Sequence, residues 1–269
     1  MRVKRQDVKI IRGLSPACKI AKIARVCTGT EGKAEATPED ALPFLEKLQK
    51  MGHGSVFEHA RIKVDRQEFL KHIVPYAPTF CYGFESRIVR RDEYYMMNIR
   101  DYLASGGRLQ SIVDHEEADD YLTARFFIDI GISRELIRHR SMSFMERSTR
   151  WCGWREEEDG VEFIIPEAAL FEWSDEMQVE FQHTCATAEK HYFTLLKQGA
   201  KKQEARLALP LCTATTLYVS GTFDKWIDLL KLRLGTRAHP QMRSIMRKLI
   251  NLPEFPENVK QLALREADK

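Results

Sequence analysis

Residues 138–150 carry the densest chemical signal in this 269-residue chain, and they run RHRSMSFMERSTR. Together with Arg134 they place five arginines within seventeen residues, interleaved with serine and threonine hydroxyls. Guanidinium groups donate paired, charge-assisted hydrogen bonds, an arrangement that suits phosphate oxygens. A solvated basic surface with internal pairs to Glu135 and Glu146 fits the composition equally well, because surface charge clusters are common. Composition therefore leaves a phosphate site and a plain basic face as equal interpretations.

The segment immediately upstream predicts a strand at residues 122–130. Apolar side chains alternate with polar ones there, which is the period of a strand with one face toward the core. Gly131 and Ser133 are expected to end this strand, and a short helix from about Arg134 is expected to carry the basic cluster. The apolar face consists of Leu122, Ala124, Phe126, Ile128 and Ile130.

Further out, the N-terminal part predicts a helix followed by a strand. Thr37 and Pro38 form a helix start, with Thr as N-cap and Pro at the first helical position, and Gly52 is a plausible stop. Ile62 and Val64 alternate with polar residues and predict a strand after His59. Residues 70–118 are interpreted as an insertion or enlarged connection with a helix around residues 94–103.

The C-terminal part predicts helices almost throughout. They are expected at about 174–196, from about 201, at 224–234 and from Pro240 to before Pro253, with an exposed amphipathic helix from Asn258. Strands early and helices late predict an α+β fold, with helices packed on a twisted, largely antiparallel sheet. No linker divides the chain, so residues 1–269 are predicted to form a single domain.

Composition narrows the function classes. The formal net charge of +3 is too small for the whole-protein field to favour nucleic acid or a membrane, so neither partner is expected. No segment has the length and apolarity of a secretory signal or a membrane span. The cysteines are widely spread without a C-x-x-C pair, which predicts reduced thiols in the cytoplasm. They are Cys18, Cys27, Cys81, Cys152, Cys185 and Cys212.

The order of residues in 138–150 resembles the signature of flavin-dependent thymidylate synthases, R-H-R-x-x-S-x-N-x-x-S-x-R. Six fixed positions match and only the Asn differs, replaced by Met145. Three further segments resemble family elements in the expected order: residues 52–59, residues 205–210 and, more loosely, residues 232–243. The matching signature positions are Arg138, His139, Arg140, Ser143, Ser148 and Arg150.

The resemblance implies site residues position by position. Arg233 and Ser148 are the implied catalytic residues, with Arg233 against the pyrimidine carbonyls, where a cation stabilises negative charge developing on the ring. No metal is implied. The implied FAD-binding residues are His53, Ser55, Glu58, Arg138, His139, Arg140, Leu232 and Arg237. The implied nucleotide-binding residues are Glu135, Glu146, Ser148, Thr149, Arg150, Arg206 and Arg233, with Arg150 and Arg206 on the phosphate.

The implied reaction is reductive C5 methylation of dUMP, with methylenetetrahydrofolate as carbon source, FAD as hydride relay and NADPH as reductant. The implied assembly is a homotetramer with shared active sites. Two alternatives stay open: a related enzyme acting on another pyrimidine nucleotide such as UMP, and a flavin-free phosphate- or nucleic-acid-binding module. Met145 and Glu135, the latter standing where the family usually has a neutral amide, keep the first alternative open. The departures on the flavin side are Met145, Thr222, Asp224, Asp228 and Arg237.

Two other signals predict structure rather than chemistry. Cys212 has no adjacent base, so a buried core thiol is expected there and not a nucleophile. His115 and the acidic residues 116–120 are consecutive and lack metal-ligand spacing, which predicts a solvated acidic loop.

Overall fold

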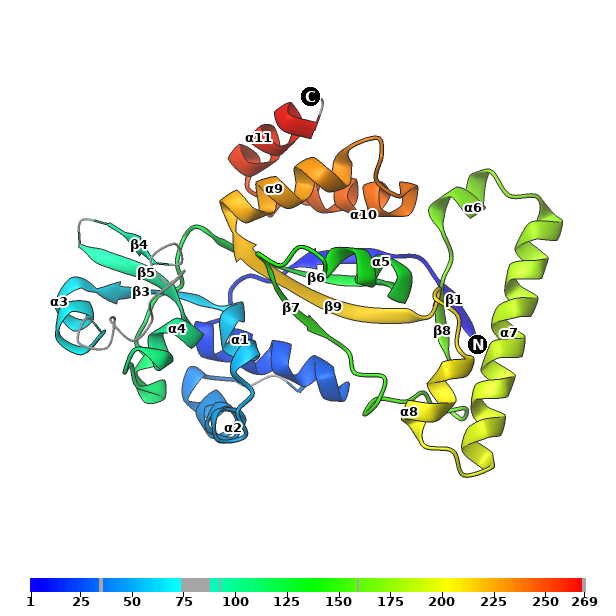
Figure 1. Cartoon of the computed structure of the whole chain (residues 1–269), viewed down its shortest axis with the longest axis horizontal. Helices are drawn as coiled ribbons and strands as arrows, with labels where there is room; N and C mark the ends of the chain where they lie inside the picture. Colours follow the sequence, from blue (N-terminus) through cyan, green and yellow to red (C-terminus); the bar gives the residue numbers. More distant parts are fainter. Residues whose placement is uncertain (34–35, 74–87, 92, 159, 268–269) are drawn as a thin grey trace.

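The computed structural model describes residues 1–33, 36–73, 88–91, 93–158 and 160–267. Three sheets follow one another along its long axis (Figure 1). The central antiparallel sheet has the order β2 (Asp7–Ile10), β6 (Tyr121–Asp129), β9 (Ala214–Thr222), β7 (Ser143–Glu146). The second antiparallel sheet has the order β3 (Arg61–Asp65), β5 (Tyr94–Asn98), β4 (Val89–Arg90). At the opposite end β1 (Arg2–Lys4) pairs in parallel with β8 (Glu162–Ile164).

Helices cover both faces of the central sheet (Figure 1). One face carries α9 (Phe223–Leu234), α10 (Pro240–Ile250) and α11 (Glu257–Ala267), and the other carries α1 (Pro16–Arg25) and α2 (Pro38–Lys50). The long helix α7 (Asp175–Lys197) stands at the end of the molecule beside β1 and β8. The remaining short helices are α3 (Arg66–Glu68), α4 (Ile99–Ala104), α5 (Ile130–Leu136), α6 (Glu167–Phe171) and α8 (Lys202–Ala205). The predicted α+β class with a largely antiparallel sheet is confirmed.

The main core lies between the central sheet and the helices α9 to α11. The predicted apolar face of β6 is buried there, with Leu122 and Phe126 at 3% and 0% exposure. Trp226 of α9 is fully buried against this face, and its indole Nε1 donates to the Leu122 carbonyl at 3.0 Å. Burial of such large apolar groups is the main favourable term in folding, so this layer holds β6 and β9 in place against the helices.

The sequence signals for α2 and β3 are confirmed. Thr37 and Asp40 form a reciprocal capping box at the start of α2, and Pro38 occupies the first helical position. Gly52 follows the helix with φ of +74°, the left-handed conformation that glycine adopts without strain.

The central strand β9 is the largest error in the sequence prediction. Residues 214–222 lie in the part that the sequence predicts to be helical, yet they pair with both β6 and β7. All nine residues are buried, so the strand's sequence lacks the apolar–polar alternation by which a half-exposed strand is recognised. The second helical half is therefore interrupted by the most buried strand of the fold.

Two element boundaries also differ from expectation. Helix α5 begins at Ile130 and includes Gly131 and Ser133, because the Asp129 carboxylate caps it by accepting from the Ile132 amide at 2.8 Å. The helix expected at residues 94–103 is a strand followed by a helix, β5 and then α4. Asn98 caps α4 through the Asp101 amide, at 2.8 Å.

The segment 70–118 and the residues after it differ in part from expectation. Residues 74–87 and 92 lie outside the described part, and the interpretation of 70–118 as an insertion into a single domain stays a prediction. The acidic residues 116–120 are only partly solvated, because Glu117 pairs with the buried Lys19 and Asp120 with the buried Arg61. The C-terminal helix α11 buries Val259 and Ala263 in the main core.

Candidate functional site

Two cavities lie at opposite ends of β9. The first, here the Glu58 cavity, has a volume of about 660 Å³ and includes residues 220–222 at the end of that strand. The second, here the Arg206 cavity, has a volume of about 580 Å³ and includes Thr215 near its start. The strand therefore contributes to both cavities, and each one also receives residues from the signature segment 138–150.

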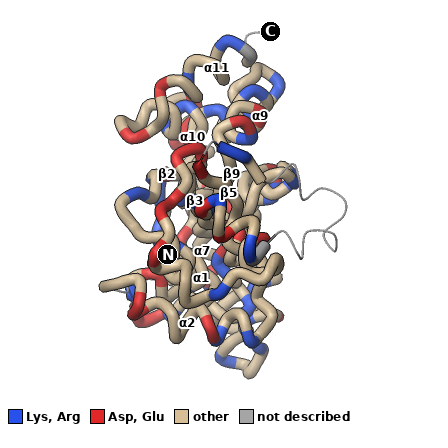
Figure 2. The backbone as a smooth tube through the Cα atoms, turned by 90° about the vertical axis from the view of Figure 1, so that its left-hand side faces the viewer, with Lys and Arg blue, Asp and Glu red and all other residues tan. Residues whose placement is uncertain are grey.

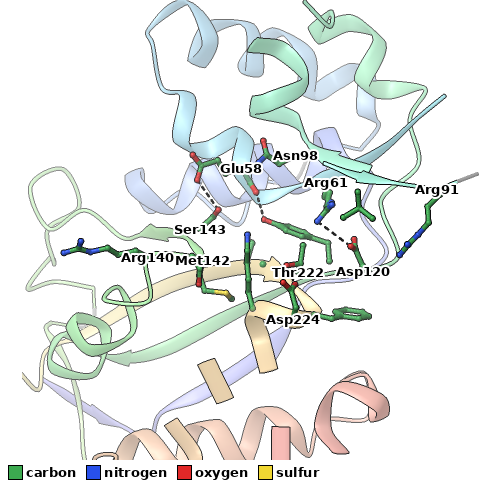
Figure 3. Close-up of a pocket in the computed structure, with 17 residues that line it drawn as sticks. Glu58, Arg61, Arg91, Asn98, Asp120, Arg140, Met142, Ser143, Thr222 and Asp224 are labelled. Atoms are coloured by element: carbon green, nitrogen blue, oxygen red, sulfur yellow. Dashed lines mark hydrogen bonds and ion pairs between the residues drawn. The ribbon is translucent and has the colours of Figure 1, made fainter. Parts of the chain in front are cut away.

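Glu58 is held in its cavity by three contacts, of which Figure 3 shows those with Ser143 and Tyr121. It closes the short helical turn of residues 54–59 and forms an ion pair with Arg100. Ser143 donates from Oγ to its carboxylate at 3.1 Å. The Tyr121 hydroxyl donates to its main-chain carbonyl at 2.5 Å. These contacts join β6 and β7 to the turn, so the position of Glu58 is fixed by the fold.

The Glu58 cavity carries both signs of charge. Arg61 and Asp120 form an ion pair at 3.5 Å, and burial raises the pKa of Asp120 while Arg61 opposes that rise. In the part of the chain that the structure describes, Arg91, Arg140 and Lys225 line the cavity without a carboxylate partner. Figure 3 shows Arg140 at the edge, with its guanidinium turned away from the other labelled side chains. Arg91 lies near enough to Asp120 to lower the pKa of that carboxyl, but in the described chain none of the three cations forms a salt bridge.

The residues predicted to bind the cofactor are only partly brought together. Glu58 and Arg140 line the Glu58 cavity. His139 is half-buried and lies elsewhere, in contact with Arg233. The others are exposed and line neither cavity: His53, Ser55, Arg138, Leu232 and Arg237.

The residues predicted to bind the nucleotide meet more completely. Glu146, Ser148, Thr149 and Arg206 all line the Arg206 cavity. Arg206 donates from Nη1 to Thr149 Oγ1 at 2.7 Å, although the two residues lie 57 positions apart. The strand β7 ends at Glu146, and the chain then runs toward α8, which immediately precedes Arg206 (Figure 1). This path brings the signature segment to the 205–210 segment, as the resemblance implies.

Glu146 and Arg150 differ in how they take part. The Glu146 carboxylate accepts from the Ser133 hydroxyl at 2.7 Å, which orients it at the cavity wall. Arg150 is exposed, lies 6.0 Å from the Trp151 ring centroid and does not line the cavity. Of the two arginines predicted to bind the phosphate, the described chain therefore brings Arg206 but not Arg150 to this cavity.

Arg233 and Glu135 form a third cluster with His139. Arg233 donates from Nε to His139 Nε2 at 2.7 Å and from Nη2 to the Glu135 carbonyl at 2.8 Å. The Glu135 carboxylate lies 3.4 Å from Arg233 Nη1. Burial and the Arg233 charge lower the pKa of His139, which keeps its imidazole neutral and able to accept. The cluster lines neither cavity, but it joins a residue expected on FAD to one expected on the pyrimidine.

The flavin-side departures have different structural roles. Met145 points away from both cavities, and its sulfur lies 3.1 Å from the Cys27 sulfur. Thr222 and Asp224 line the Glu58 cavity and hydrogen-bond to each other. Asp228 is exposed. The packing around Met145 therefore accounts for the methionine at that position, while Thr222 and Asp224 alter the lining of the Glu58 cavity.

Sequence reasoning missed several residues of both cavities. Arg61, Asp120 and Lys225 line the Glu58 cavity, and Arg147 lines the Arg206 cavity without a role implied by the resemblance. The sequence singled out Arg147 as one arginine of the basic cluster, and Asp120 as part of the acidic residues 116–120, where a solvated loop was expected. Arg61 and Asp120 come from segments far apart in the sequence and meet through the pairing of β3 with the chain before β6.

Other residues singled out in the sequence lie outside both cavities. Cys212 is half-buried and its sulfur lies 3.8 Å from that of Cys185, whose hydrogen bond lowers the Cys212 pKa. Among the residues that the structure describes, no three His, Cys, Asp or Glu side chains are grouped as a metal would require. A helix long and apolar enough to span a bilayer is likewise absent from the described ranges.

Known proteins resemble this chain in both sequence and fold. The family model described as thymidylate synthase complementing protein matches residues 72–256. A probable flavin-dependent thymidylate synthase of Paramecium bursaria Chlorella virus 1 is 28% identical over 179 residues, which cover 59% of this chain and 80% of the relative. The flavin-dependent thymidylate synthase of Geobacter sulfurreducens is 21% identical over 241 residues, covering 88% of this chain and 77% of the relative.

A solved structure extends the similarity to the whole fold. The UMP/dUMP methylase PolB from Streptomyces cacaoi, bound with 5-Br UMP, aligns with a TM-score of 0.52 at 16% identity, over 99% of this chain and 97% of that chain. The family match spans more than half of the chain and includes the signature segment and both downstream elements. The chain therefore belongs to the thymidylate synthase complementing protein family.

Proposed function

We propose that this chain is an FAD-dependent methyltransferase that methylates C5 of a pyrimidine nucleotide, with dUMP as substrate, methylenetetrahydrofolate as carbon donor and NADPH as reductant. The relatives reported above carry the name of this activity. The observation that carries the proposal is the Arg206 cavity. Four residues implied to hold the nucleotide meet there, from segments separated by more than fifty residues.

The residues of the Glu58 cavity fit FAD. Arg91, Arg140 and Lys225 supply cations without carboxylate partners in the described part of the chain, which suits the two charges of a pyrophosphate. Tyr121 and Phe223 supply ring surface on the same wall. When bound, FAD would supply hydride transfer, which no protein side chain can provide. The chain's own contribution is to bind, orient and exclude water.

Arg233 has a defined electrostatic role in this proposal. A fixed guanidinium beside a pyrimidine carbonyl stabilises the negative charge that develops as C5 becomes nucleophilic. Its Nε is held by neutral His139 and its Nη2 by the Glu135 carbonyl, so the fold and not the substrate orients the guanidinium. Ser148 lines the Arg206 cavity, where its hydroxyl is placed to orient the nucleotide.

We further propose a homotetramer with active sites shared between subunits. Five implied cofactor residues and Arg150 are exposed and line neither cavity within the chain. A second subunit laid over this surface would bring them to the two cavities.

The described cysteines are all free, although the sulfur atoms of Cys185 and Cys212 lie 3.8 Å apart, which supports a reducing, cytoplasmic location.

UMP is the second candidate substrate. The structural neighbour is named as a UMP/dUMP methylase, and Glu135 stands where the family resemblance implies a neutral amide. A nucleotide panel with measured dissociation constants separates the two, because the 2′-hydroxyl must be either accommodated or excluded. Tighter binding and faster turnover of dUMP than of UMP are expected. Equal values would make the chain a methylase of both.

The decisive experiment combines the visible spectrum of the purified protein with turnover. Bound oxidised flavin, a spectral change on adding dUMP, and NADPH- and methylenetetrahydrofolate-dependent formation of dTMP are the expected results. A colourless protein that ignores added FAD, with steeply salt-dependent oligonucleotide binding, would instead favour the flavin-free module. Figure 2 shows acidic residues interspersed with basic ones along the described backbone in that view, whereas such a module is expected to gather basic residues on one face.

A further inference from the structure

Arg147 holds an unusual position between β7 and the loop that follows it. Its main-chain N–H donates to the Thr216 carbonyl at 2.9 Å, which continues the pairing of β7 with β9 by one residue. Its guanidinium lies 5.3 Å from the ring centroid of Trp154, and that residue is 7% exposed. A guanidinium over a buried indole is held in one orientation by cation–π attraction. The side chain is therefore preorganised.

The donors of Arg147 are largely unused. Within the described residues, its side chain makes one hydrogen bond, from Nη2 to the Gly153 carbonyl at the long distance of 3.5 Å. Its Nε is buried without an acceptor. Arg147 also lines an adjoining cavity, and the two acidic residues of its described lining pair with other arginines, Glu31 with Arg125 and Glu162 with Arg2.

An unsatisfied, partly buried guanidinium is costly to hold in a fold. The cost is offset when an anion binds, and Arg147 lines the Arg206 cavity together with Arg134 and Arg206. Among the described residues of that wall, Glu146 is the one carboxylate, and it is held by Ser133. Three guanidinium groups against one carboxylate leave a formal charge of +2, which matches a phosphate monoester dianion.

We propose that Arg147 is a further substrate-binding residue that, together with Arg206, binds the phosphate of the nucleotide. The inference rests on the proposed function for its substrate class, a pyrimidine nucleoside 5′-monophosphate. It adds a ligand that lies outside the matched positions of the signature. Trp154 acts through Arg147 as a positioning residue.

The test compares dUMP with deoxyuridine, which differ only by the phosphate. Calorimetric titration of wild type and Arg147→Gln is expected to show dUMP affinity lowered about tenfold or more, with deoxyuridine affinity unchanged. A structural role alone would weaken both ligands equally, and that result, or an unchanged dUMP affinity, overturns the inference. Arg155→Gln is the matched control, because Arg155 lies in the same loop, is exposed and pairs with Glu158.

Two further arms keep the outcomes separate. Arg147→Lys retains the positive charge but lacks the paired donors of the guanidinium, so it is expected to bind dUMP with intermediate affinity. This variant also tests the inference if the Gln variant does not fold. Calorimetric titration of wild type and Arg147→Gln with inorganic phosphate tests the anion site without a nucleoside. Wild type that binds phosphate through Arg147 but no pyrimidine nucleotide would contradict the proposed function and keep the anion site. Wild type that binds neither contradicts both.

Discussion

Arg233 donates to His139 across 2.7 Å, from Nε to Nε2, although the two residues lie 94 positions apart. The bond requires a neutral imidazole with its proton on Nδ1. Burial and the neighbouring guanidinium charge both lower the pKa of His139 and so maintain that state. His139, which is expected beside the flavin, thus orients the guanidinium of Arg233, which is expected beside the pyrimidine.

Replacement of Arg233 by Ala is expected to abolish turnover and to leave flavin absorbance largely intact. The pKa of His139 should also rise, because one of the two causes of its lowering is removed. NMR titration of the imidazole and a turnover assay measure the two effects. Arg247→Ala, on the exposed side of α10, is the control. Undiminished turnover of the Arg233 variant would remove Arg233 from the mechanism.

Glu135→Gln is expected to tighten nucleotide binding. The carboxylate lies 3.4 Å from Arg233 and partly cancels the charge that the pyrimidine carbonyls would meet. The pair is partly exposed, so the gain should be modest, about twofold to fivefold in the dissociation constant for dUMP. Calorimetric titration of both proteins measures it. Weaker binding in the variant would show that the carboxylate itself contacts the ligand.

Arg206→Gln is expected to lower dUMP affinity about tenfold or more, because charge-assisted hydrogen bonds to phosphate are lost. Thr149 also loses its 2.7 Å partner, but FAD binding in the separate Glu58 cavity should be unaffected. Flavin absorbance and nucleotide titration on the same sample separate the effects. Loss of flavin together with nucleotide would mean that the variant has disturbed the fold.

His59 predicts acid-sensitive stability. It is fully buried, with Nδ1 2.8 Å from the Ser220 hydroxyl, and burial lowers its pKa to about 3. The unfolded chain takes up a proton near pH 6.5 while the folded chain does not, so stability falls as pH drops from 6.5 toward 3. The loss should be roughly 2 kcal/mol between about pH 6.5 and 5. Urea unfolding at several pH values measures it.

The matched variant for that profile is His59→Gln, which keeps a polar side chain beside Ser220. Its unfolding free energy should depend less on pH over the same interval. The buried Asp129, whose pKa is raised by burial, contributes with the opposite sign and is present in both proteins. An identical pH profile for the two proteins would show that His59 is not the source.

Met145→Asn restores the family signature but is expected to destabilise the protein. The thioether packs against Cys27 and the cluster around Tyr218, where an amide would find few hydrogen-bond partners. A loss of about 1–3 kcal/mol in the free energy of unfolding is expected, with flavin affinity unchanged. A gain in flavin affinity would show that position 145 acts on the cofactor after all.

Local signals in the sequence predict the elements that depend on local chemistry. The Thr37–Pro38 start predicts α2, and the alternation along β6 predicts its buried face, because capping and one-sided burial leave marks in nearby residues. β9 could not be found by alternation, since it is buried on both faces. Its threonines, Tyr218 and Val219 have high strand propensity, which was the signal available.

The site follows the same division. Glu146, Ser148 and Thr149 are nearly contiguous and meet Arg206 as the resemblance implies. The ion pair of Arg61 with Asp120 depends on how β3 docks beside β6, which no local pattern encodes. The exposed residues expected at the cofactor, such as His53 and Arg237, line neither cavity of the described chain, and their predicted role depends on the proposed second subunit.

The nine residues of β9 set the distance between the Arg206 cavity and the Glu58 cavity. Thr215 touches the cavity proposed for the nucleotide and Thr222 the cavity proposed for the cofactor, about 23 Å apart along an extended strand. Because both faces of the strand are packed, a bend or a shift of register would disturb buried contacts. A one-residue deletion would shorten the strand by about 3.3 Å and also turn every following side chain to the opposite face. The length of this strand is therefore as constrained as any residue in either cavity.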